Sequence, residues 1–191
     1  MKNSTAKKIS ELIERYPALE ICRADLILAV EKICQTFRAG NKLLVCGNGG
    51  SAATASHYVC DFNKGISEKK EKKFNFVCLN DNYPQMMAIA NDISYDEVFR
   101  FPLINKLKPT DLVIGISGSG NSKNVMSATV VARALGIKVI GLTGAKGGEL
   151  ATVADVCVKA PSDETYIIQE FHLPIYHCWC LMLEDKFFGN A

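Results

Sequence analysis

The sequence lacks features that would place it in several large classes of proteins. It has no excess of one charge, because 22 Lys and Arg face 20 Asp and Glu among 191 residues, and this balance gives no argument for a nucleic-acid partner. No apolar run approaches the roughly 20 residues of a membrane span, and the first residues contain no secretory apolar segment. We therefore expect a cytoplasmic protein that binds neither nucleic acid nor membranes.

The eight cysteines lack the spacing of a zinc finger. Cys46, Cys78 and Cys157 lie within apolar segments of strand length, and the one close pair, Cys178 and Cys180, falls in a predicted helix. We expect buried free thiols, which suit the reducing cytosol.

Apolar segments of strand length alternate with segments of helical periodicity along the chain. Strands are predicted at 42–46, 74–79, 112–116, 139–142 and 156–158, and the main helices at 3–16, 19–39, 51–63, 85–90, 95–106, 122–135 and 166–186. The alternation predicts an α/β fold: a doubly wound, mainly parallel five-stranded sheet with helices on both faces. We expect one domain over 1–191, in which the N-terminal helical pair of residues 1–40 serves packing or oligomer contacts.

Two predicted strands end in loops rich in glycine and hydroxyl side chains. The first loop, Gly47-Asn-Gly-Gly-Ser51, leads into an alanine-rich helix that Ser51 is expected to cap. The second loop carries three serines, Ser117, Ser119 and Ser122. Helix N-termini favour anions, and doubly wound sheets bind ligands at the carboxyl ends of their strands. Together the loops indicate a site for a phosphorylated small molecule.

Two nucleotide-binding alternatives find less support in these loops. The Walker A lysine pattern is absent, which argues against a nucleoside triphosphatase. The segment Gly47–Ala52 fits the loose G-x-G-x-x-A form of nicotinamide-binding proteins, but the acid expected about 20 residues further on is missing, because Asp81 comes too late. We expect no nucleotide cofactor.

Groups that could move protons are few, since the chain has only three histidines. His57 and Asp61 are four residues apart and share one helix face. Gln169 precedes His177 by eight residues, about two turns of the last predicted helix. These four could converge as a proton-transfer pair or as a metal site, while the spacing leaves a surface pair of His57 with Asp61 equally open. His172 is expected to be a packing histidine.

The order of these motifs resembles that of the sugar isomerase (SIS) domain family, specifically its phosphoheptose isomerase branch. The resemblance covers nearly the whole chain and rests on Gly47–Ser51, the helix with His57 and Asp61, Ala90-Asn-Asp92, Gly115–Ser122, Leu142-Thr-Gly144 and Gln169–His172. It implies an isomerase that interconverts sedoheptulose 7-phosphate and glycero-manno-heptose 7-phosphate, in heptose synthesis for bacterial lipopolysaccharide or capsule. It also implies a homotetramer with active sites between subunits.

The resemblance assigns roles to single residues. Asp61 and His177 correspond to the catalytic base and acid of an enediol proton transfer. The substrate-binding positions correspond to Asn48, Gly49, Gly50, Ser51, Asp92, Ser117, Gly118, Ser119, Ser122 and Gln169. Some family members bind zinc through four residues, which correspond to His57, Asp61, Gln169 and His177. A zinc-bound carboxylate is a poorer base, so base and ligand are competing roles for Asp61, and the sequence does not decide between them.

Three positions depart from the family pattern. Asp61 stands where the family has glutamate. Its side chain is one methylene shorter, which reduces its reach by roughly 1.5 Å. This matters because a misplacement of about 1 Å can cost on the order of a hundredfold in rate. Ile168 stands where members often have a basic residue, and Lys64-Gly65 where they carry an arginine. The alternative is a non-catalytic SIS protein, either a sugar-phosphate sensor or a replication-initiator-associated adaptor. The retained histidines and carboxylate favour the enzyme.

Overall fold

A five-stranded, all-parallel sheet runs through the centre of the protein in the computed structural model, which describes residues 3–68 and 70–189. The strands are hydrogen-bonded in the order β2-β1-β3-β4-β5, with bounds β1 Leu43–Gly47, β2 Phe76–Cys78, β3 Leu112–Ile116, β4 Lys138–Thr143 and β5 Val156–Lys159. Every residue of β1 and β3 is buried, as a parallel strand covered on both faces requires. The predicted fold class is confirmed. Residues 1–2, 69 and 190–191 of the expected domain lie outside the described residues.

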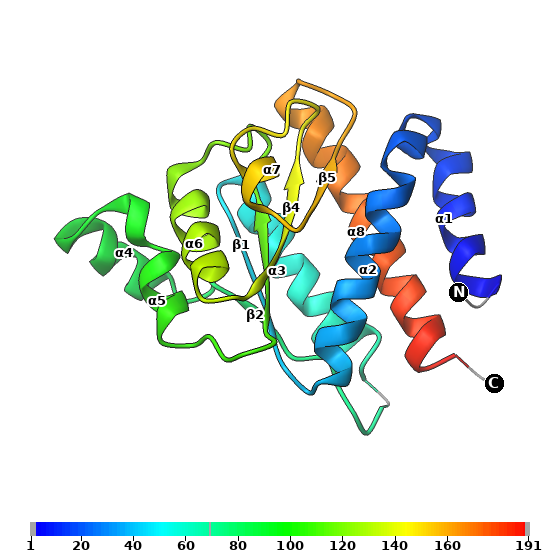
Figure 1. Ribbon diagram of the computed structural model, residues 1–191, viewed down its shortest axis with the longest axis horizontal. Helices are drawn as coiled ribbons and strands as arrows, with labels where there is room; N and C mark the ends of the chain where they lie inside the picture. The colour runs from blue at the N-terminus through cyan, green and yellow to red at the C-terminus, as the bar shows by residue number, and fades with distance from the viewer. Residues whose placement is uncertain (1–2, 69, 190–191) are drawn as a thin grey trace.

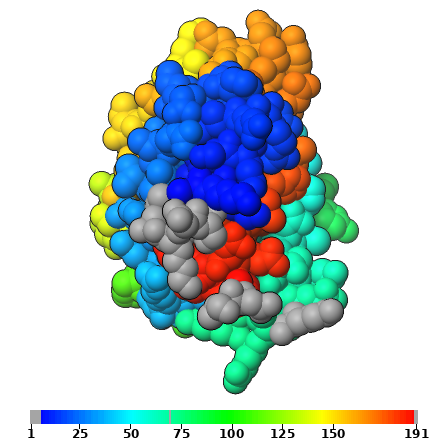
Figure 2. Space-filling model, turned by 90° about the vertical axis from the view of Figure 1, so that its right-hand side faces the viewer, coloured from blue at the N-terminus to red at the C-terminus, as the bar shows by residue number. Residues whose placement is uncertain are grey.

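Helices cover both faces of the sheet (Figure 1). One face carries α2 (Arg23–Arg38), α3 (Gly50–Cys60) and α8 (Thr165–Phe187), with α1 (Asn3–Arg15) packed on α8. The other face carries α5 (Arg100–Ile104), α6 (Lys123–Ala134) and α7 (Leu150–Val153), with α4 (Tyr83–Asp92) outermost. Figure 2 looks onto the first side, where dark-blue α1 lies across the red end of α8. Consequently α8, which carries His177, and α3, which leads directly into the turn that begins at Asp61, lie on one face.

Short irregular turns shift several predicted boundaries. The predicted helix at 19–39 begins with the 3-10 turn η1 (Pro17–Cys22), and the one at 95–106 is divided into the 3-10 turn η3 (Tyr95–Glu97) and α5. The predicted helix at 51–63 ends at Cys60 and continues as a π-helical turn, η2 (Asp61–Gly65). In the case of α4, Asn82 accepts a hydrogen bond from the N–H of Gln85, so this helix starts earlier than predicted.

The order of the strands places the two glycine-rich loops side by side. β1 has β2 on one side and β3 on the other, so the chain winds away from β1 in both directions. Gly47 at the end of β1 is paired with Ile116 at the end of β3. The loops that follow these residues therefore begin at the switch point of the sheet, where open α/β folds bind ligands.

All eight cysteines are free, and six are buried, which confirms the prediction of free thiols. Cys60 is exposed and Cys157 is half-buried, so the expectation that the thiols are buried does not hold for these two cysteines. Within 3–68 and 70–189, every helix falls short of the length and apolar character that crossing a membrane demands.

Candidate active site

The loop after β1 brings the backbone against the side chain of Gln169. A Cβ atom on Gly50 would lie 2.3 Å from Oε1 of Gln169, so a larger residue here would force the end of the Gln169 side chain to move. Gly49 is the N-cap residue of α3, with a φ of +55°. The prediction that Ser51 caps the helix is wrong, because α3 begins at Gly50 and Ser51 lies inside its first turn, with its N–H donating to the carbonyl of Asn48 at 2.9 Å.

The loop after β3 gathers the three predicted hydroxyls. Oγ of Ser117 donates to Oγ of Ser122 across 3.0 Å and lies 3.5 Å from Oγ of Ser119. The loop is fixed from outside, since the N–H of Gly144 donates to the carbonyl of Gly118 at 2.8 Å. A cavity of ≈ 230 Å³ opens beside it, lined by Gly118, Ser119, Asn121, Lys146, Asp163, Thr165 and Ile168. The three hydroxyls thus lie together in one loop, Ser119 lines the cavity, and the cation on the cavity wall, Lys146, is paired with Asp163 at 3.4 Å.

The buried side chain of Asn124 and the exposed side chain of Tyr95 hold Asn48 in place, and sequence reasoning singled out neither. Asn48 and Asn124 exchange a pair of amide hydrogen bonds, each 2.8 Å long, and Asn124 is only 2% exposed. The hydroxyl of Tyr95 donates to Oδ1 of Asn48 at 2.9 Å. The available signal was a polar amide one turn after the serine loop, which is costly to bury unless it is paired. The pairing orients Asn48 at the mouth of the glycine loop.

His57, Asp61 and His177 meet at the end of α3. Oδ2 of Asp61 lies 3.5 Å from Nε2 of His57 and 3.4 Å from Nε2 of His177. The two imidazole rings stand nearly perpendicular, with centroids 5.6 Å apart. The side chains keep 51%, 30% and 45% exposure for His57, Asp61 and His177, so a ligand can reach them. The spacing on α3 predicted one half of this group, and the packing of α8 supplies the other.

A cavity of ≈ 370 Å³ opens onto this group, lined by Arg15, Asp61, Gly65, Ile66, His177, Cys180 and Leu181. Partial burial lowers the pKa of His177, and the neighbouring carboxylate of Asp61 offsets part of this effect. An imidazole with a lowered pKa is neutral near pH 7. In that form His177 carries one N–H donor and one acceptor nitrogen.

A buried tyrosine supports the group from behind. The hydroxyl of Tyr176 lies 2.6 Å from Nδ1 of His57, and the tyrosine is fully buried. Burial raises the pKa of the Tyr176 phenol well above its ordinary value. Sequence reasoning missed this residue. Its signal was a tyrosine in an apolar helix, because a buried phenol needs a hydrogen-bond partner.

Gln169 and Asp92 lie away from the His57–Asp61–His177 group. Eight residues of helix correspond to about 12 Å of rise between Gln169 and His177, and the Gln169 side chain lies against the glycine loop. Asp92 is exposed at the end of α4, where its carboxylate accepts a hydrogen bond from Asn91 at 2.8 Å.

The donor atoms of His57, Asp61 and His177 fit a metal ion. All three lie within 4.8 Å of one another. Donors around tetrahedral zinc, each about 2.0–2.1 Å from the ion, are roughly 3.4 Å apart, which matches the 3.5 and 3.4 Å contacts of Asp61. Three protein ligands of this kind leave a fourth position for substrate or water, the arrangement of a catalytic metal site.

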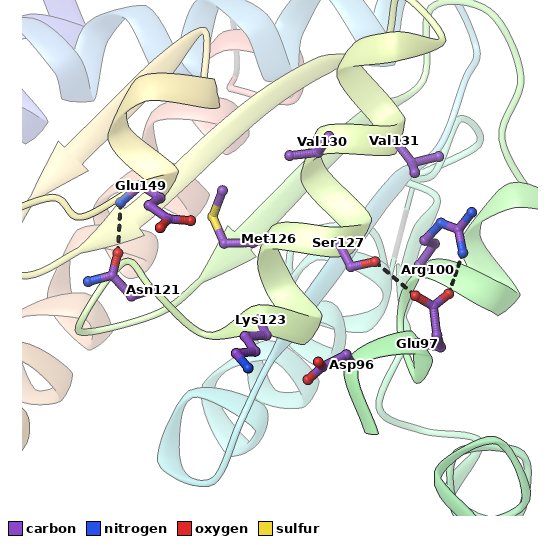
Figure 3. A pocket seen from close by; sticks show the side chains of 10 residues that line it. All are labelled: Asp96, Glu97, Arg100, Asn121, Lys123, Met126, Ser127, Val130, Val131 and Glu149. Atoms are coloured by element: carbon purple, nitrogen blue, oxygen red, sulfur yellow. Dashed lines mark hydrogen bonds and ion pairs between the residues drawn. The ribbon is translucent and has the colours of Figure 1, made fainter. Parts of the chain in front are cut away.

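A larger hollow of ≈ 640 Å³ lies elsewhere, between α6 and the η3–α5 segment (Figure 3). Glu97 crosses its floor, bound to Ser127 and paired with Arg100. Asp96 and Glu149 also line it. The predicted site residues, all of them among the described residues, lie outside its wall. With three carboxylates against two cations, this hollow does not suit a phosphate.

Comparison with known proteins gives a consistent result. The SIS domain family model matches residues 6–144. The chain is 44% identical over 162 residues to the probable phosphoheptose isomerase of Thermoplasma acidophilum, which covers 85% of this chain and 88% of that protein. It is 36% identical over 191 residues to the phosphoheptose isomerase of Akkermansia muciniphila, across 100% of both chains. The solved structure of a phosphoheptose isomerase from Neisseria gonorrhoeae matches with a TM-score of 0.79 at 34% identity, covering 92% of this chain and 94% of that one.

Proposed function

Because the chain belongs to the phosphoheptose isomerase branch of the SIS domain family, we propose that it interconverts sedoheptulose 7-phosphate and glycero-manno-heptose 7-phosphate. The observation that carries this proposal is the carboxylate of Asp61 lying 3.4 Å from the imidazole of His177 beside an open cavity. A carboxylate and an imidazole together provide the base and the acid that an aldose–ketose isomerisation needs. The product serves heptose synthesis for a surface polysaccharide.

The reaction moves a carbonyl between C1 and C2 through an enediol. Asp61 takes the carbon-bound proton, and the N–H of a neutral His177 donates to the carbonyl oxygen as charge develops there. The lowered pKa of His177 supports this role, because a neutral imidazole presents an N–H that hydrogen-bonds to the developing oxyanion while keeping its proton. The roles reverse between the two reaction directions.

The phosphate binds the serine cradle. The hydroxyls of Ser119 and Ser122 lie 3.5 and 3.0 Å from that of Ser117. Ser122 stands at the N-cap of α6, where the helix dipole favours an anion. Ser51 completes the cradle from the glycine loop. Asn48, Gly49, Gly50, Asp92 and Gln169 are assigned to the sugar, and Gly118 to the wall of the cradle.

Zinc is the proposed metal, and His57, Asp61 and His177 are the residues that would hold it. A carboxylate that holds a metal is a poorer base, so the zinc site and the free acid–base pair are alternative states of these residues. When bound, it supplies a Lewis acid that polarises the substrate carbonyl. Gln169, the fourth ligand that the resemblance implies, is separated from His177 by about 12 Å of helix. Its contact with Gly50 supports the substrate-binding role instead.

We also propose that the chain forms a homotetramer and works in the cytoplasm. Exposed apolar side chains on and next to α4 support self-association, because Tyr83, Met87 and Ile93 are 69%, 68% and 56% exposed. The eight free cysteines support a reducing compartment. Sedimentation of the purified protein tests the assembly, and a monomer at micromolar concentration would contradict it.

The decisive experiment incubates the purified protein with sedoheptulose 7-phosphate, with and without zinc, and follows the aldose product by NMR. His177→Ala is expected to lose on the order of 10²–10⁴ in kcat. Ser119→Ala, as a contrasting variant, should raise KM instead, because it removes a donor to the phosphate. A wild-type protein that binds the sugar phosphate without turnover, and binds it equally well after His177→Ala, would be a sensor.

A further inference from the structure

The hydrogen bond between Tyr176 and His57 links the interior of the protein to its most exposed candidate ligand. The phenol oxygen lies 2.6 Å from Nδ1 of His57. Tyr176 is fully buried on α8, whereas half of the His57 side chain is exposed on α3. An exposed imidazole left to itself samples several ring orientations. This bond selects one of them.

The selected orientation turns the other ring nitrogen toward Asp61. With Nδ1 occupied by the phenol, Nε2 of His57 points to Oδ2 of Asp61 at 3.5 Å. A phenol can donate or accept. As donor to Nδ1, it leaves the His57 proton on Nε2, facing the carboxylate. As acceptor from Nδ1–H, it leaves the Nε2 lone pair free for a cation.

Tyr176 also packs against the second imidazole. Its ring centroid lies 5.5 Å from that of His57 and 4.5 Å from that of His177, its neighbour in the chain. One buried stretch of α8 therefore sets the positions of both imidazoles that flank Asp61. The ring is itself fixed by Tyr58, at 5.0 Å between centroids.

We propose that Tyr176 is the positioning residue of the His57–Asp61–His177 group. It does not touch substrate, because it is fully buried, and it acts by holding Nε2 of His57 toward Asp61. Partners of this kind, bonded to the second nitrogen of a metal-binding histidine, typically contribute 10–100-fold to metal affinity. The proposal rests on the proposed function for its catalytic consequence, but not for its structural and metal-binding consequences.

Tyr176→Phe tests the proposal, and Tyr58→Phe is its matched control. Both substitutions remove one hydroxyl from a fully buried ring on the same face. The Tyr58 hydroxyl has no hydrogen-bond partner among the described residues, so its removal should leave the site unchanged. Thermal unfolding of both variants checks that the core is intact.

The first measurement uses ¹⁵N NMR of the histidine rings in the metal-free protein. We expect the Nδ1 resonance of His57 to shift in Tyr176→Phe and to stay at its wild-type position in Tyr58→Phe. The second measurement is the affinity for zinc alone, by competition with a chelating indicator. We expect Tyr176→Phe to bind about 10–100-fold more weakly than wild type, and to have no further effect in a His57→Asn background.

An unchanged His57 resonance in Tyr176→Phe overturns the proposal, whether or not the protein isomerises heptose phosphates. Zinc binding within twofold of wild type overturns its metal-binding consequence. If the wild-type protein is active, kcat should fall in Tyr176→Phe while KM stays within about twofold. If the wild-type protein is inactive, the proposed function fails and the NMR result still decides the role of Tyr176.

Discussion

Asp61 and Ile66 are joined by a π-helical hydrogen bond, in which the N–H of Ile66 donates to the carbonyl of Asp61 across 3.0 Å. A regular α-helix would bond Ile66 to Phe62. Here the carbonyl of Phe62 accepts from the buried hydroxyl of Ser67 instead, at 2.7 Å. Such single π turns are frequent at functional sites because they redirect a side chain. The wider turn starts at the residue whose side chain is shorter than the family glutamate.

We expect Asp61→Glu to lower kcat by roughly 10–100-fold, because a misplacement of about 1 Å is this costly. The short carboxylate already lies 3.4 and 3.5 Å from the two imidazoles, and a further methylene would carry it roughly 1.5 Å beyond. Steady-state kinetics with the heptose phosphate measure the effect. Asp61→Asn, which removes the base altogether, should be worse. A faster Asp61→Glu enzyme would mean that the backbone does not compensate for the missing methylene.

The contact between Gly50 and Gln169 gives a second prediction. Gly50→Ala would place a methyl group 2.3 Å from Oε1 of Gln169 and displace this side chain from the glycine loop. We expect kcat/KM to fall on the order of a hundredfold. Steady-state kinetics with the heptose phosphate measure this effect. In a Gln169→Ala background the same change should have little further effect. Equal losses in both backgrounds would show that the damage lies in the loop, not in the contact.

Local patterns were enough to predict the sheet and the loops of the site. The spacing of apolar residues and the length of the apolar segments identified the strands. The predicted parallel sheet put the loops of Ser51 and Ser117 at the carboxyl ends of their strands, and in the structure β1 and β3 are neighbours. The pair His57 and Asp61 follows from helical spacing alone.

The remainder depended on how α8 packs across the sheet, which no local pattern encodes. Spacing placed Gln169 and His177 on one helix, but the register of α8 against α3 decides which of them meets Asp61. That register also places Tyr176 behind His57. The π turn at Asp61 was hidden for a similar reason, since the Ser67 hydroxyl that replaces a helical bond to Phe62 comes from outside the helix.

His172 gives a prediction for acid stability. Its ring is 1% exposed, Nε2 lies 3.1 Å from the carbonyl of Thr143, and Nδ1 has no partner among the described residues. Burial lowers the pKa of His172 from 6.5 to about 4. Between pH 6.5 and pH 4 the imidazole is therefore protonated in the unfolded state but neutral in the folded state. The stabilisation present above pH 6.5 is lost as the pH falls toward 4. At about 1.4 kcal/mol per pH unit, the loss reaches roughly 3 kcal/mol by pH 4.

Urea unfolding of wild type and His172→Gln between pH 7 and pH 4 measures this contribution. The glutamine keeps a donor for Thr143 but cannot titrate, so its stability should fall less steeply with acid. Parallel curves for wild type and His172→Gln would rule out His172 as the titrating group.

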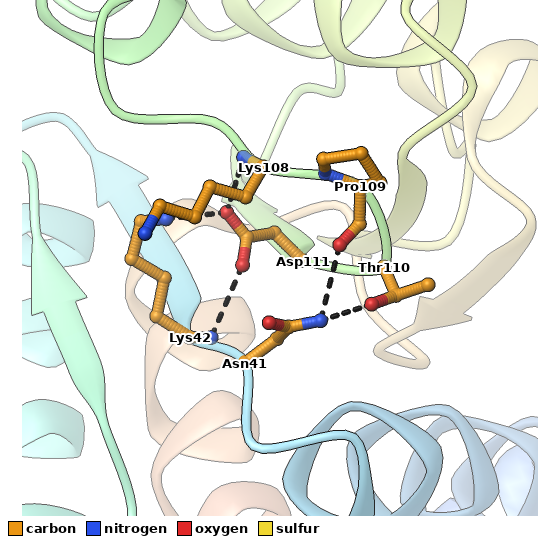
Figure 4. A network of polar contacts seen from close by, with 6 residues as sticks. All are labelled: Asn41, Lys42, Lys108, Pro109, Thr110 and Asp111. Carbon is orange, nitrogen blue, oxygen red and sulfur yellow. Dashed lines mark hydrogen bonds and ion pairs between the residues drawn. The ribbon is translucent and has the colours of Figure 1, made fainter.

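Asp111 stabilises the amino-terminal ends of the strands, on the opposite side of the sheet from the loops of the site (Figure 4). Its carboxylate is fully buried just before β3, where it pairs with Nζ of Lys42 and accepts the N–H of Lys108 at 2.7 Å. Removing one partner of a buried pair leaves an uncompensated charge, so Asp111→Ala should lower the free energy of unfolding by about 3 kcal/mol. Glu20→Gln, which breaks an exposed pair with Arg23 at 2.7 Å, should have no measurable effect. Because Asp111 lies at the far ends of the strands, kcat of the folded variant should match wild type. A loss of kcat with normal stability would instead show that the amino-terminal ends of the strands are coupled to the site at their carboxyl ends.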